Sequence, residues 1–283
     1  MRRKLFTPTT IPLAWLIALF VGPLIGVVWV SFLSRGEYGE IQFPLTLENF
    51  KRVAGFGLLG FDPLYPTILA RSLIIAAATA ALCILCALPA AFYIAGLSRR
   101  GKTIGLTLLV IPFWTNLLVR TYAWQILLGP QGWITQFAIA LHLVAPGTSL
   151  YPSHIAVLIC LVCDYLPFAA LPIYASVERI NWELAEAARD LGAGAWQTFR
   201  HGIFPQIRPG LLAGAALVFL PATGQFVIPD LLGGAKTVLL GNLLQQQFGG
   251  SRDWPFGAAI ATVSMAIVFG GLWIQARLTR KAS

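Results

Sequence analysis

Charged residues are scarce in this sequence. They make up 11% of its 283 residues, whereas 57% are hydrophobic and the mean hydropathy is +0.75. A soluble globular domain has roughly 25% charged residues, so charges this sparse do not cover a water-exposed surface of this size. Much of the surface must therefore face lipid, and we expect an all-α integral membrane protein, because helices satisfy their own backbone groups in hydrocarbon.

Motifs of catalytic sites are also missing. The sequence contains no H-E-x-x-H zinc motif, no G-x-S-x-G nucleophile elbow and no phosphate-binding loop of the G-x-x-x-x-G-K-[ST] type. The three histidines, His142, His154 and His201, have no ligand spacing between them. We therefore expect no catalytic residue, no metal and no cofactor in this chain, and it cannot hydrolyse ATP by itself.

Cysteine is limited to two C-x-x-C pairs, Cys83/Cys86 and Cys160/Cys163. In a soluble chain this spacing would suggest a zinc or redox site. Both pairs lie inside long apolar segments without flanking turns, and cysteine packs in protein interiors as a small apolar residue. The pattern favours helix packing.

Six apolar segments are long enough to cross the ~30 Å hydrocarbon core as helices. They are 11–33, 70–96, 104–128, 154–176, 210–232 and 257–277. The first segment follows a basic N-terminus and resembles a signal peptide, but it exceeds the roughly 7–15 residues of an h-region and has no clear cleavage site. We expect it to be an uncleaved first helix.

Proline and glycine within these segments predict kinks and close packing. Neighbouring helices can satisfy the carbonyls that a proline frees, so the internal prolines should kink rather than end the helices. These prolines are Pro23, Pro89, Pro112, Pro167, Pro172 and Pro221. The pairs Gly22/Gly26 and Gly210/Gly214 have the small-residue spacing that permits close helix approach.

Lys and Arg are distributed unequally between the two ends of the segments. Thirteen fall on one side: Arg2, Arg3, Lys4, Arg99, Arg100, Lys102, Arg179, Arg189, Arg200, Arg208, Arg277, Arg280 and Lys281. Five fall on the other, with Arg71 and Arg120 near helix ends: Arg35, Lys51, Arg52, Lys236 and Arg252. The positive-inside rule then places both termini in the cytoplasm. Because the net charge of +9 comes from clusters at helix ends, it does not indicate nucleic acid as a partner.

Residues 178–208, between the fourth and fifth segments, look like soluble sequence. Asn181 can cap a helix, and Glu183 falls in its first turn, where the helix dipole favours a negative charge. Leu184, Ala187, Ala188 and Leu191 recur at helical spacing and make one face apolar.

The second half of this loop predicts a turn and another short helix. Gly192 stands where a left-handed residue would end the first helix. A helix over 193–199 would place Trp196 and Phe199 on one side, before Pro205 and Pro209 break the chain. An amphipathic linker in the headgroup region is the alternative interpretation.

The stretch EAARDLGAGAWQTFRHGIFP resembles the EAA motif of permease subunits in binding-protein-dependent ABC importers of type I. Five residues fall in register with the pattern: Glu186, Ala187, Ala188, Gly192 and Pro205. Gly202 and Phe204 depart from it at its hydrophobic end. In that family the loop is the coupling helix, which fits a groove on the ATPase subunit. The resemblance therefore implies that the five matching residues couple the permease to ATP hydrolysis.

The resemblance covers nearly the whole chain and extends to the spermidine/putrescine branch, through LTLENFKRV, IPFWTNLLVRTYAW, YLPFAALPIY, FVIPDLLGGAKTVLLGN and RDWPFGAA. It implies one transmembrane permease domain over 1–283, with the six-helix type I fold and the cytoplasmic coupling loop at 178–208, in the bacterial cell inner membrane. The implied partners are a dimer of ATPase subunits that bind the ATP, a second and different permease subunit, an extracytoplasmic solute-binding protein and membrane lipid. An ion-coupled secondary transporter, or an ABC importer for another small solute such as an amino acid or opine derivative, is the alternative.

Polar and aromatic residues inside the apolar segments are candidates for a substrate pathway. They are Trp114, Arg120, Tyr122, Asp164, Tyr165, Gln225 and Asp230. Asp164 stands out because a carboxylate near a helix centre costs several kcal/mol unless it faces a cavity or a partner. It would attract a cationic amine, or it would form an ion pair with another helix, for example with Arg120. Arg120 itself would snorkel to the interface or act at a gate.

Overall fold

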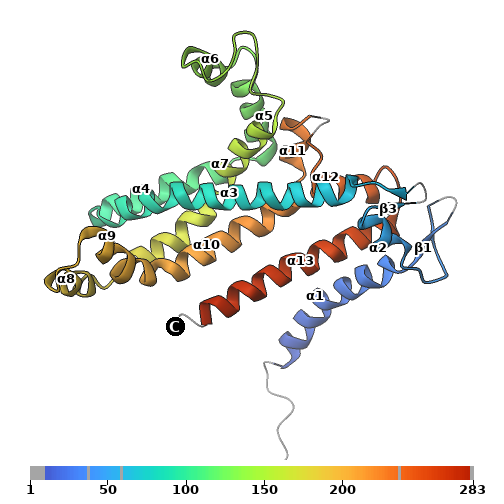
Figure 1. Cartoon of the computed structure of the whole chain (residues 1–283), viewed down its shortest axis with the longest axis horizontal. Coiled ribbons are helices and arrows are strands. Elements are labelled where there is room, and N and C mark those ends of the chain that lie inside the picture. The colour runs from blue at the N-terminus through green and yellow to red at the C-terminus, as the bar shows by residue number, and fades with distance from the viewer. Residues whose placement is uncertain (1–9, 37–38, 58–59, 235–236, 281–283) are drawn as a thin grey trace, which may run out of the picture. The chain divides into compact units, whose positions relative to one another are not determined.

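The structure is a computed structural model of the whole chain, and it describes residues 10–36, 39–57, 60–234 and 237–280. Apart from two short hairpins, its regular elements are helices (Figure 1). The chain divides into two compact units, Met1–Leu69 with Leu243–Gly270 and Ala70–Asn242 with Gly271–Ser283. Five basic residues used above for orientation lie outside the described residues: Arg2, Arg3, Lys4, Lys236 and Lys281.

The first unit contains α1 (Thr10–Ser31) and the greater part of α13 (Trp254–Arg280). The buried amide of Asn49 donates to the carbonyls of Ser31 (3.0 Å) and Leu33 (2.8 Å), so it fixes the segment after α1 to the end of that helix. That segment forms two antiparallel hairpins and one helix: β1 (Ser34–Arg35) with β2 (Ile41–Gln42), α2 (Glu48–Val53), and β3 (Phe56–Gly57) with β4 (Gly60–Phe61).

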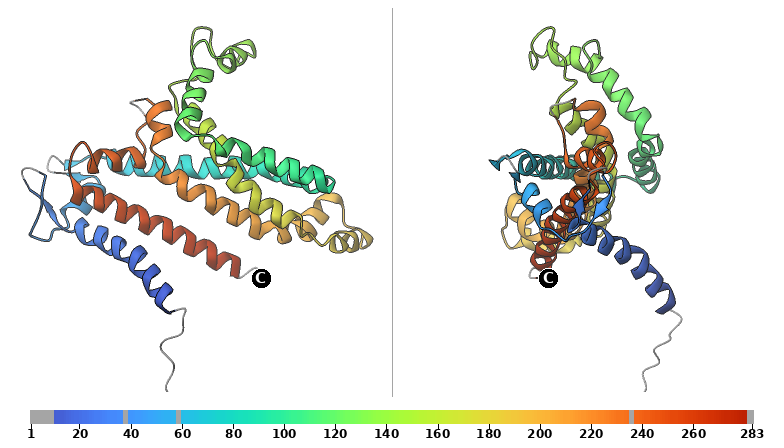
Figure 2. Two further views of the ribbon diagram at one scale, coloured as in Figure 1. Left: turned by 180° about the vertical axis from the view of Figure 1, so that it is seen from behind. Right: turned by 90° about the vertical axis from the view of Figure 1, so that its right-hand side faces the viewer.

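The second unit is built around α7 (His154–Val177) and α10 (Phe204–Gly224), which run side by side (Figures 1 and 2). A Cβ atom at Gly210 would lie 2.3 Å from Ser176 Oγ and 2.6 Å from the carbonyl oxygen of Pro172, and one at Gly214 would lie 3.1 Å from the carbonyl oxygen of Ala169. The predicted close approach at this glycine pair is therefore confirmed. At Gly22 and Gly26 in α1, no neighbouring atom of the described residues lies within 4 Å of the position that a Cβ would take.

Further helices of this unit pack on that pair or on one another. Cys83 of α3 and Cys160 of α7 belong to the buried core, and the Cys83 thiol donates to the carbonyl oxygen of Val162 at 3.5 Å, as helix packing predicts. Apart from the loop over 178–208, these elements are α4 (Arg99–Val110), the 3-10 turn η1 (Ile111–Trp114), α5 (Leu117–Leu128), α6 (Trp133–Ala140) and α11 (Val227–Leu232). Helices α3 (Leu64–Ala95) and α12 (Leu240–Phe248) each belong partly to the first unit.

Five described helices are long and apolar enough to cross a membrane: Pro12–Ser31, Leu64–Ala95, His154–Val177, Ala195–Gly224 and Trp254–Trp273. A sixth crossing results if the bent pair Arg99–Trp114 and Leu117–Ala140 forms one span. The two halves of that pair meet at 92°.

The prediction of one continuous helix over 104–128 is therefore wrong. Helix α4 ends at Val110, Pro112 lies in the 3-10 turn, and α5 begins at Leu117. Asn116 Oδ1 accepts hydrogen bonds from the backbone N–H groups of Leu118 (2.8 Å) and Val119 (3.4 Å) and so starts a new helix. Proline at this position removes a helical donor, and the asparagine cap stabilises the break.

The segment 210–232 is also interrupted, where one helix was predicted. Helix α10 ends at Gly224, and Gln225 has an extended backbone. The Gln225 Oε1 atom accepts from the N–H groups of Phe226 (3.0 Å), which precedes α11, and of Val227 (3.3 Å), which begins it. A polar side chain thus again supplies the partners that a helix terminus lacks.

The predicted chain break at Pro205 and Pro209 does not occur. Helix α10 begins at Phe204, with Pro205 in its first turn and Pro209 inside it. Pro205 is accommodated where a π-helical turn, Thr198–Ile203, passes directly into α10, because the helical hydrogen-bond pattern changes at that junction. The chain runs as one helical span from Ala195 to Gly224.

Candidate functional site

The loop between α7 and α10 folds as two short helices and a wide turn. Helix α8 (Trp182–Asp190) is followed by α9 (Ala195–Gln197) and a π-helical turn, η2 (Thr198–Ile203). Together they lie at the end of α7 and α10 that is remote from α11 (Figure 1). The predicted cap and stop are confirmed: Asn181 Oδ1 accepts from the Glu183 N–H at 2.9 Å, and Gly192 has a φ of +85°.

Helix α8 leaves its predicted apolar face uncovered. Leu184 is 54% exposed and Leu191 90% exposed, while Glu186 and Ala187 are exposed beside them. The side chain that packs inward is instead Ala185, which is buried against η2. An exposed face of leucine and alanine, with the exposed carboxylate of Glu186 on another side of the same helix, is suited to binding another protein.

Aromatic side chains extend this surface beyond the turn. The rings of Trp196 and Phe199 stack with centroids 6.0 Å apart, so their predicted placement on one side is confirmed. Phe199 also lies 6.3 Å from Phe204, and Trp196 is largely exposed.

Two polar contacts hold the base of the loop. The Lys102 ammonium lies 3.2 Å from Glu178 Oε1 and so joins α4 to the end of α7. The Tyr174 hydroxyl and the Lys102 ammonium hold the pKa of the Glu178 carboxyl below its usual value. On the other flank, Gln206 in the first turn of α10 is hydrogen-bonded to the backbone of Asn181.

Sequence reasoning missed both Ala185 and Gln206. Ala185 precedes the matching Glu-Ala-Ala residues, and nothing in the spacing marks it as the inward position. Gln206 is an amide within the otherwise apolar and basic stretch IFPQIRP, which is a weak signal. Its partners are backbone groups, so no pattern of side chains indicates them.

Four of the seven membrane pathway candidates lie on α7 or contact it. The Arg120 Nε atom of α5 lies 2.5 Å from Asp164 Oδ1 of α7, and Asp164 is only 4% exposed. Arg120 Nη1 also donates to the carbonyl oxygen of Pro112 at 2.7 Å, across the break between η1 and α5. The ion pair that the sequence left open is therefore present, and the Arg120 side chain is mostly buried rather than extended to an interface.

The next residue of α7 reaches the second helix break. The Tyr165 hydroxyl accepts a hydrogen bond from Gln225 Nε2 at 3.2 Å, between α10 and α11. Asp164 and Tyr165, adjacent in sequence, thus contact the two positions where membrane helices are interrupted. The other three candidates, Trp114, Tyr122 and Asp230, lie exposed on the surface of the chain.

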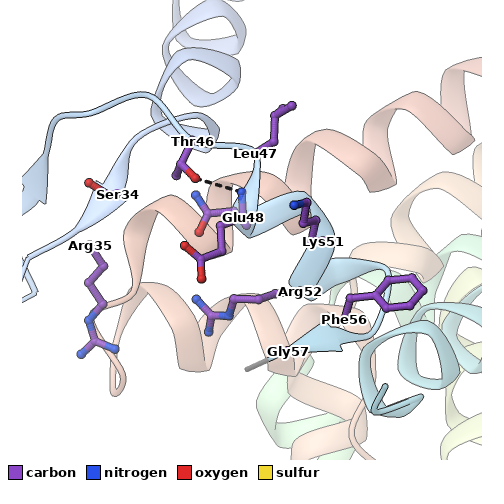
Figure 3. A pocket seen from close by; sticks show the side chains of 10 residues that line it. Ser34, Arg35, Thr46, Leu47, Glu48, Lys51, Arg52, Phe56 and Gly57 are labelled. Carbon is purple, nitrogen blue, oxygen red and sulfur yellow. Dashed lines mark hydrogen bonds between the residues drawn. The ribbon is translucent and has the colours of Figure 1, made fainter. Parts of the chain in front are cut away.

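The first unit contains a cavity of about 730 Å³ beside α2 (Figure 3). Asp253 is buried and holds Arg52 at 3.0 Å and Arg35 at 3.8 Å, while the Arg52 guanidinium also lies 3.9 Å from the centre of the Phe256 ring. The cavity has three basic side chains against one acidic side chain, so it does not favour a cationic ligand. It is lined by Ser34, Arg35, Thr46, Leu47, Glu48, Asn49, Lys51, Arg52, Phe56 and Gly57.

Comparison with known sequences gives matches over most of the chain. Residues 84–283 match the family described as "Binding-protein-dependent transport system inner membrane component". The spermidine/putrescine transport system permease protein PotB of Escherichia coli (strain K12) is 38% identical over 271 residues, which cover 94% of this chain and 96% of PotB. PotB of Haemophilus influenzae is 39% identical over 258 residues (90% and 88%). The inner membrane ABC transporter permease protein YdcU of Escherichia coli is 29% identical over 270 residues (91% and 84%).

Solved structures show the same fold. A bacterial alginate ABC transporter in complex with its alginate pentasaccharide-bound periplasmic protein contains a chain with a TM-score of 0.68 at 15% identity, covering 96% of this chain and 94% of that one. The MetNI methionine ABC transporter in an inward-facing conformation gives a TM-score of 0.56 at 15% identity, covering 77% and 95%. At this identity the likeness concerns the fold alone.

Proposed function

The chain belongs to the binding-protein-dependent ABC importer permeases, multi-pass proteins of the inner membrane, and we propose that it carries polyamines of the spermidine/putrescine class. The observation that carries the proposal is 38% identity to PotB over 94% of the chain. In this family ATP hydrolysis lies with separate ATPase subunits and a periplasmic binding protein delivers the solute, so this subunit is not itself an enzyme. Membership of this family also excludes the alternative function, that of an ion-coupled secondary transporter.

The loop over 178–208 is the proposed contact with the ATPase, on the cytoplasmic side. The proposal rests on the five residues in register with the EAA pattern: Glu186, Ala187, Ala188, Gly192 and Pro205. It is supported by the exposed apolar face of α8, because two alanines allow a partner to approach the helix backbone closely. The turn at Gly192 supports it too, since other residues adopt a positive φ only at a cost of ~1–2 kcal/mol.

The proposed transport cycle uses α8 as the moving part. ATP binding closes the ATPase dimer, which displaces α8 and rocks this subunit against a second, different permease subunit. The solute leaves its binding protein, enters the cavity between the two permeases and is released when hydrolysis resets the complex. Coupling requires that the ATPase bind the two permease states with different affinity, because only differential interaction shifts an equilibrium.

The substrate pathway is proposed to use aromatic faces more than a free carboxylate. Asp164 is already paired with Arg120, so it offers a cation less attraction than an unpaired acid would. Exposed Trp114 and Tyr122 can add cation–π contacts of ~0.5–2 kcal/mol for an ammonium group. The remaining members of the proposed path are Tyr165, Gln225 and Asp230.

Uptake by the reconstituted complex tests the proposal. The chain is purified with its ATPase, partner permease and binding protein, placed in proteoliposomes, and supplied with labelled spermidine, putrescine, an amino acid or an opine derivative. We expect polyamine uptake that requires both ATP and the loaded binding protein. ATP-dependent uptake of an amino acid or opine derivative, with no polyamine uptake, would overturn the proposed substrate.

A further inference from the structure

We propose that Gln206 is a positioning residue that fixes the coupling loop to α10, so that displacement of α8 reaches the membrane helices. The inference rests on the coupling role proposed above for the loop. It assigns a role to a side chain outside the residues that match the EAA pattern.

The amide of Gln206 joins three parts of the second unit. Its Oε1 atom accepts a hydrogen bond from the backbone N–H of Asn181 at 2.8 Å. Its Nε2 atom donates to the carbonyl oxygen of Asn181 at 3.3 Å and to that of Gly202 at 2.7 Å. One side chain therefore ties the residue that precedes α8, the turn η2 and the first turn of α10.

Asn181 is the fixed point at the start of α8. Its own side chain caps the helix through the N–H of Glu183, so its backbone N–H and carbonyl are the groups that Gln206 binds. Asn181 and Gln206 are 25 positions apart in sequence. Their hydrogen bonds therefore connect the beginning of the loop to its end.

The other end of α8 is held by bonds between residues close in sequence: the Gly194 N–H donates to Gln197 Oε1 at 3.2 Å, and Thr198 Oγ1 donates to the carbonyl oxygen of Ala193 at 3.5 Å. Gly192 has a φ of +85°, and neither Gly192 nor Gly194 has an atom within 4 Å of the position a Cβ would take. Glycine has the greatest backbone freedom of any residue, so this connection can bend. Without a tie at Asn181, α8 could tilt about these glycines while α10 stays in place.

Apolar packing between the loop and α10 does not by itself fix the orientation of α8. Ala185 is buried against η2, and Ile203 and Ile207 are buried below it. Burial of such side chains is favourable but non-directional. A hydrogen-bonded amide has defined geometry, and it presents a donor and an acceptor that match the N–H and carbonyl of one peptide residue.

The proposal is tested in the complete complex with Gln206→Leu and Gln206→Glu. Leucine removes all three hydrogen bonds at similar volume, whereas glutamate keeps the acceptor for the Asn181 N–H and loses both donors. Gln136→Leu is the matched control, because Gln136 is an exposed amide in α6 that bonds locally to the carbonyl oxygen of Pro130. Three quantities are measured: co-purification of the ATPase, stimulation of ATP hydrolysis by the loaded binding protein, and solute transported per ATP.

We expect Gln206→Leu to retain the ATPase and to lower solute transported per ATP by about three- to tenfold, as expected when one or two net hydrogen bonds are lost from a coupling step. Gln206→Glu should fall between Gln206→Leu and wild type, and Gln136→Leu should match wild type. Unchanged coupling in Gln206→Leu, or loss of the assembled complex in both Gln206 variants, would overturn the inference. If the loaded binding protein stimulates ATP hydrolysis by the wild-type complex but no polyamine is taken up, the proposed substrate is wrong. The Gln206 variants are then compared with wild type by how strongly the loaded binding protein stimulates their ATP hydrolysis.

Discussion

At the scale of single residues, Arg120 shows how a partner determines what a charge can do in a membrane. Its guanidinium contacts the Asp164 carboxylate and the carbonyl oxygen of Pro112. An unpaired carboxylate at this depth would be costly and would attract cations, whereas a paired one contributes chiefly to the arrangement of the helices. The pair joins α5, η1 and α7 at the place where the chain bends by 92°.

Substitutions at this pair test its structural role. Arg120→Gln leaves the Asp164 carboxylate buried without a partner, so we expect the free energy of unfolding to fall by about 3–5 kcal/mol. The double variant Arg120→Gln/Asp164→Asn removes both charges and should recover most of that loss. Thermal unfolding of the purified complex in detergent measures both effects.

Asp164→Asn alone separates the structural role from solute contact. If the carboxylate serves the ion pair, this variant should lose stability and transport together. A selective loss of polyamine uptake at unchanged unfolding temperature would show that Asp164 contacts the solute.

The sequence indicated the Arg120–Asp164 pair as an alternative because a charge inside an apolar segment requires a partner, and few partners exist. The same reasoning fails for Gln206. An amide at a helix start is compatible with solvent exposure, and its bonds to Asn181 and Gly202 depend on how the loop folds back. Residues with costly burial are therefore predictable, while those that bind backbone groups at a distance are not.

At the scale of helices, the two interruptions were beyond sequence reasoning for a physical reason. Pro89 and Pro221 lie inside continuous helices, whereas Pro112 lies at a break. Hydropathy is equally apolar in all three places, so it does not distinguish a kink from an end. The difference comes from Asn116, and in the second break from Gln225, whose side chains cap a new helix. The helices themselves, set by long apolar runs, were predictable.

The contact of α7 with α10 gives a second test. Gly210→Ala would place a Cβ 2.6 Å from the carbonyl oxygen of Pro172, and a backbone atom in a helix cannot move aside easily. We expect overpacking to lower the free energy of unfolding by about 1–3 kcal/mol. Gly224→Ala in the same helix is the control, because no atom of the described residues lies within 4 Å of that site. Equal unfolding temperatures for the two variants would contradict the packing argument.

Helix α8 gives a third test, at the proposed ATPase contact. We expect Glu186→Lys and Gly192→Asp each to abolish ATP-driven uptake while the chain still inserts into the membrane. The lysine reverses a charge on the exposed face, and the aspartate must adopt a φ of +85° at a cost of ~1–2 kcal/mol. Uptake and membrane fractionation are measured together.

Gly194→Asp is the matched control for the glycine. It adds the same charge two positions away, where φ is −68° and an aspartate suits the cap of α9. It should impair uptake less than Gly192→Asp. Solute-stimulated ATP hydrolysis at the wild-type rate in both Glu186→Lys and Gly192→Asp would contradict the coupling assignment.

At the scale of the whole molecule, the family was predictable from one motif and the fold from hydropathy. The EAA-like segment identified the permease family, and the matches over 84–283 and to PotB confirm it. The all-α class is confirmed as well, with five or six candidate spans. Helix α1 exposes nearly all its apolar side chains, which is the surface expected of a helix covered by lipid or by another subunit.

The orientation of the chain is the last prediction, and the coupling mechanism depends on it. Thirteen basic residues on one side of the spans against five on the other predict that both termini and α8 lie in the cytoplasm. We expect alkaline phosphatase, which is active only outside the cytoplasm, to be active when fused after Gly147 and inactive when fused after Ala193 or at the C-terminus. A fluorescent protein at the C-terminus should give the opposite signal. Phosphatase activity after Ala193 would place α8 outside, where no ATPase subunit can bind it, and the role proposed for Glu186, Gly192 and Gln206 would be wrong.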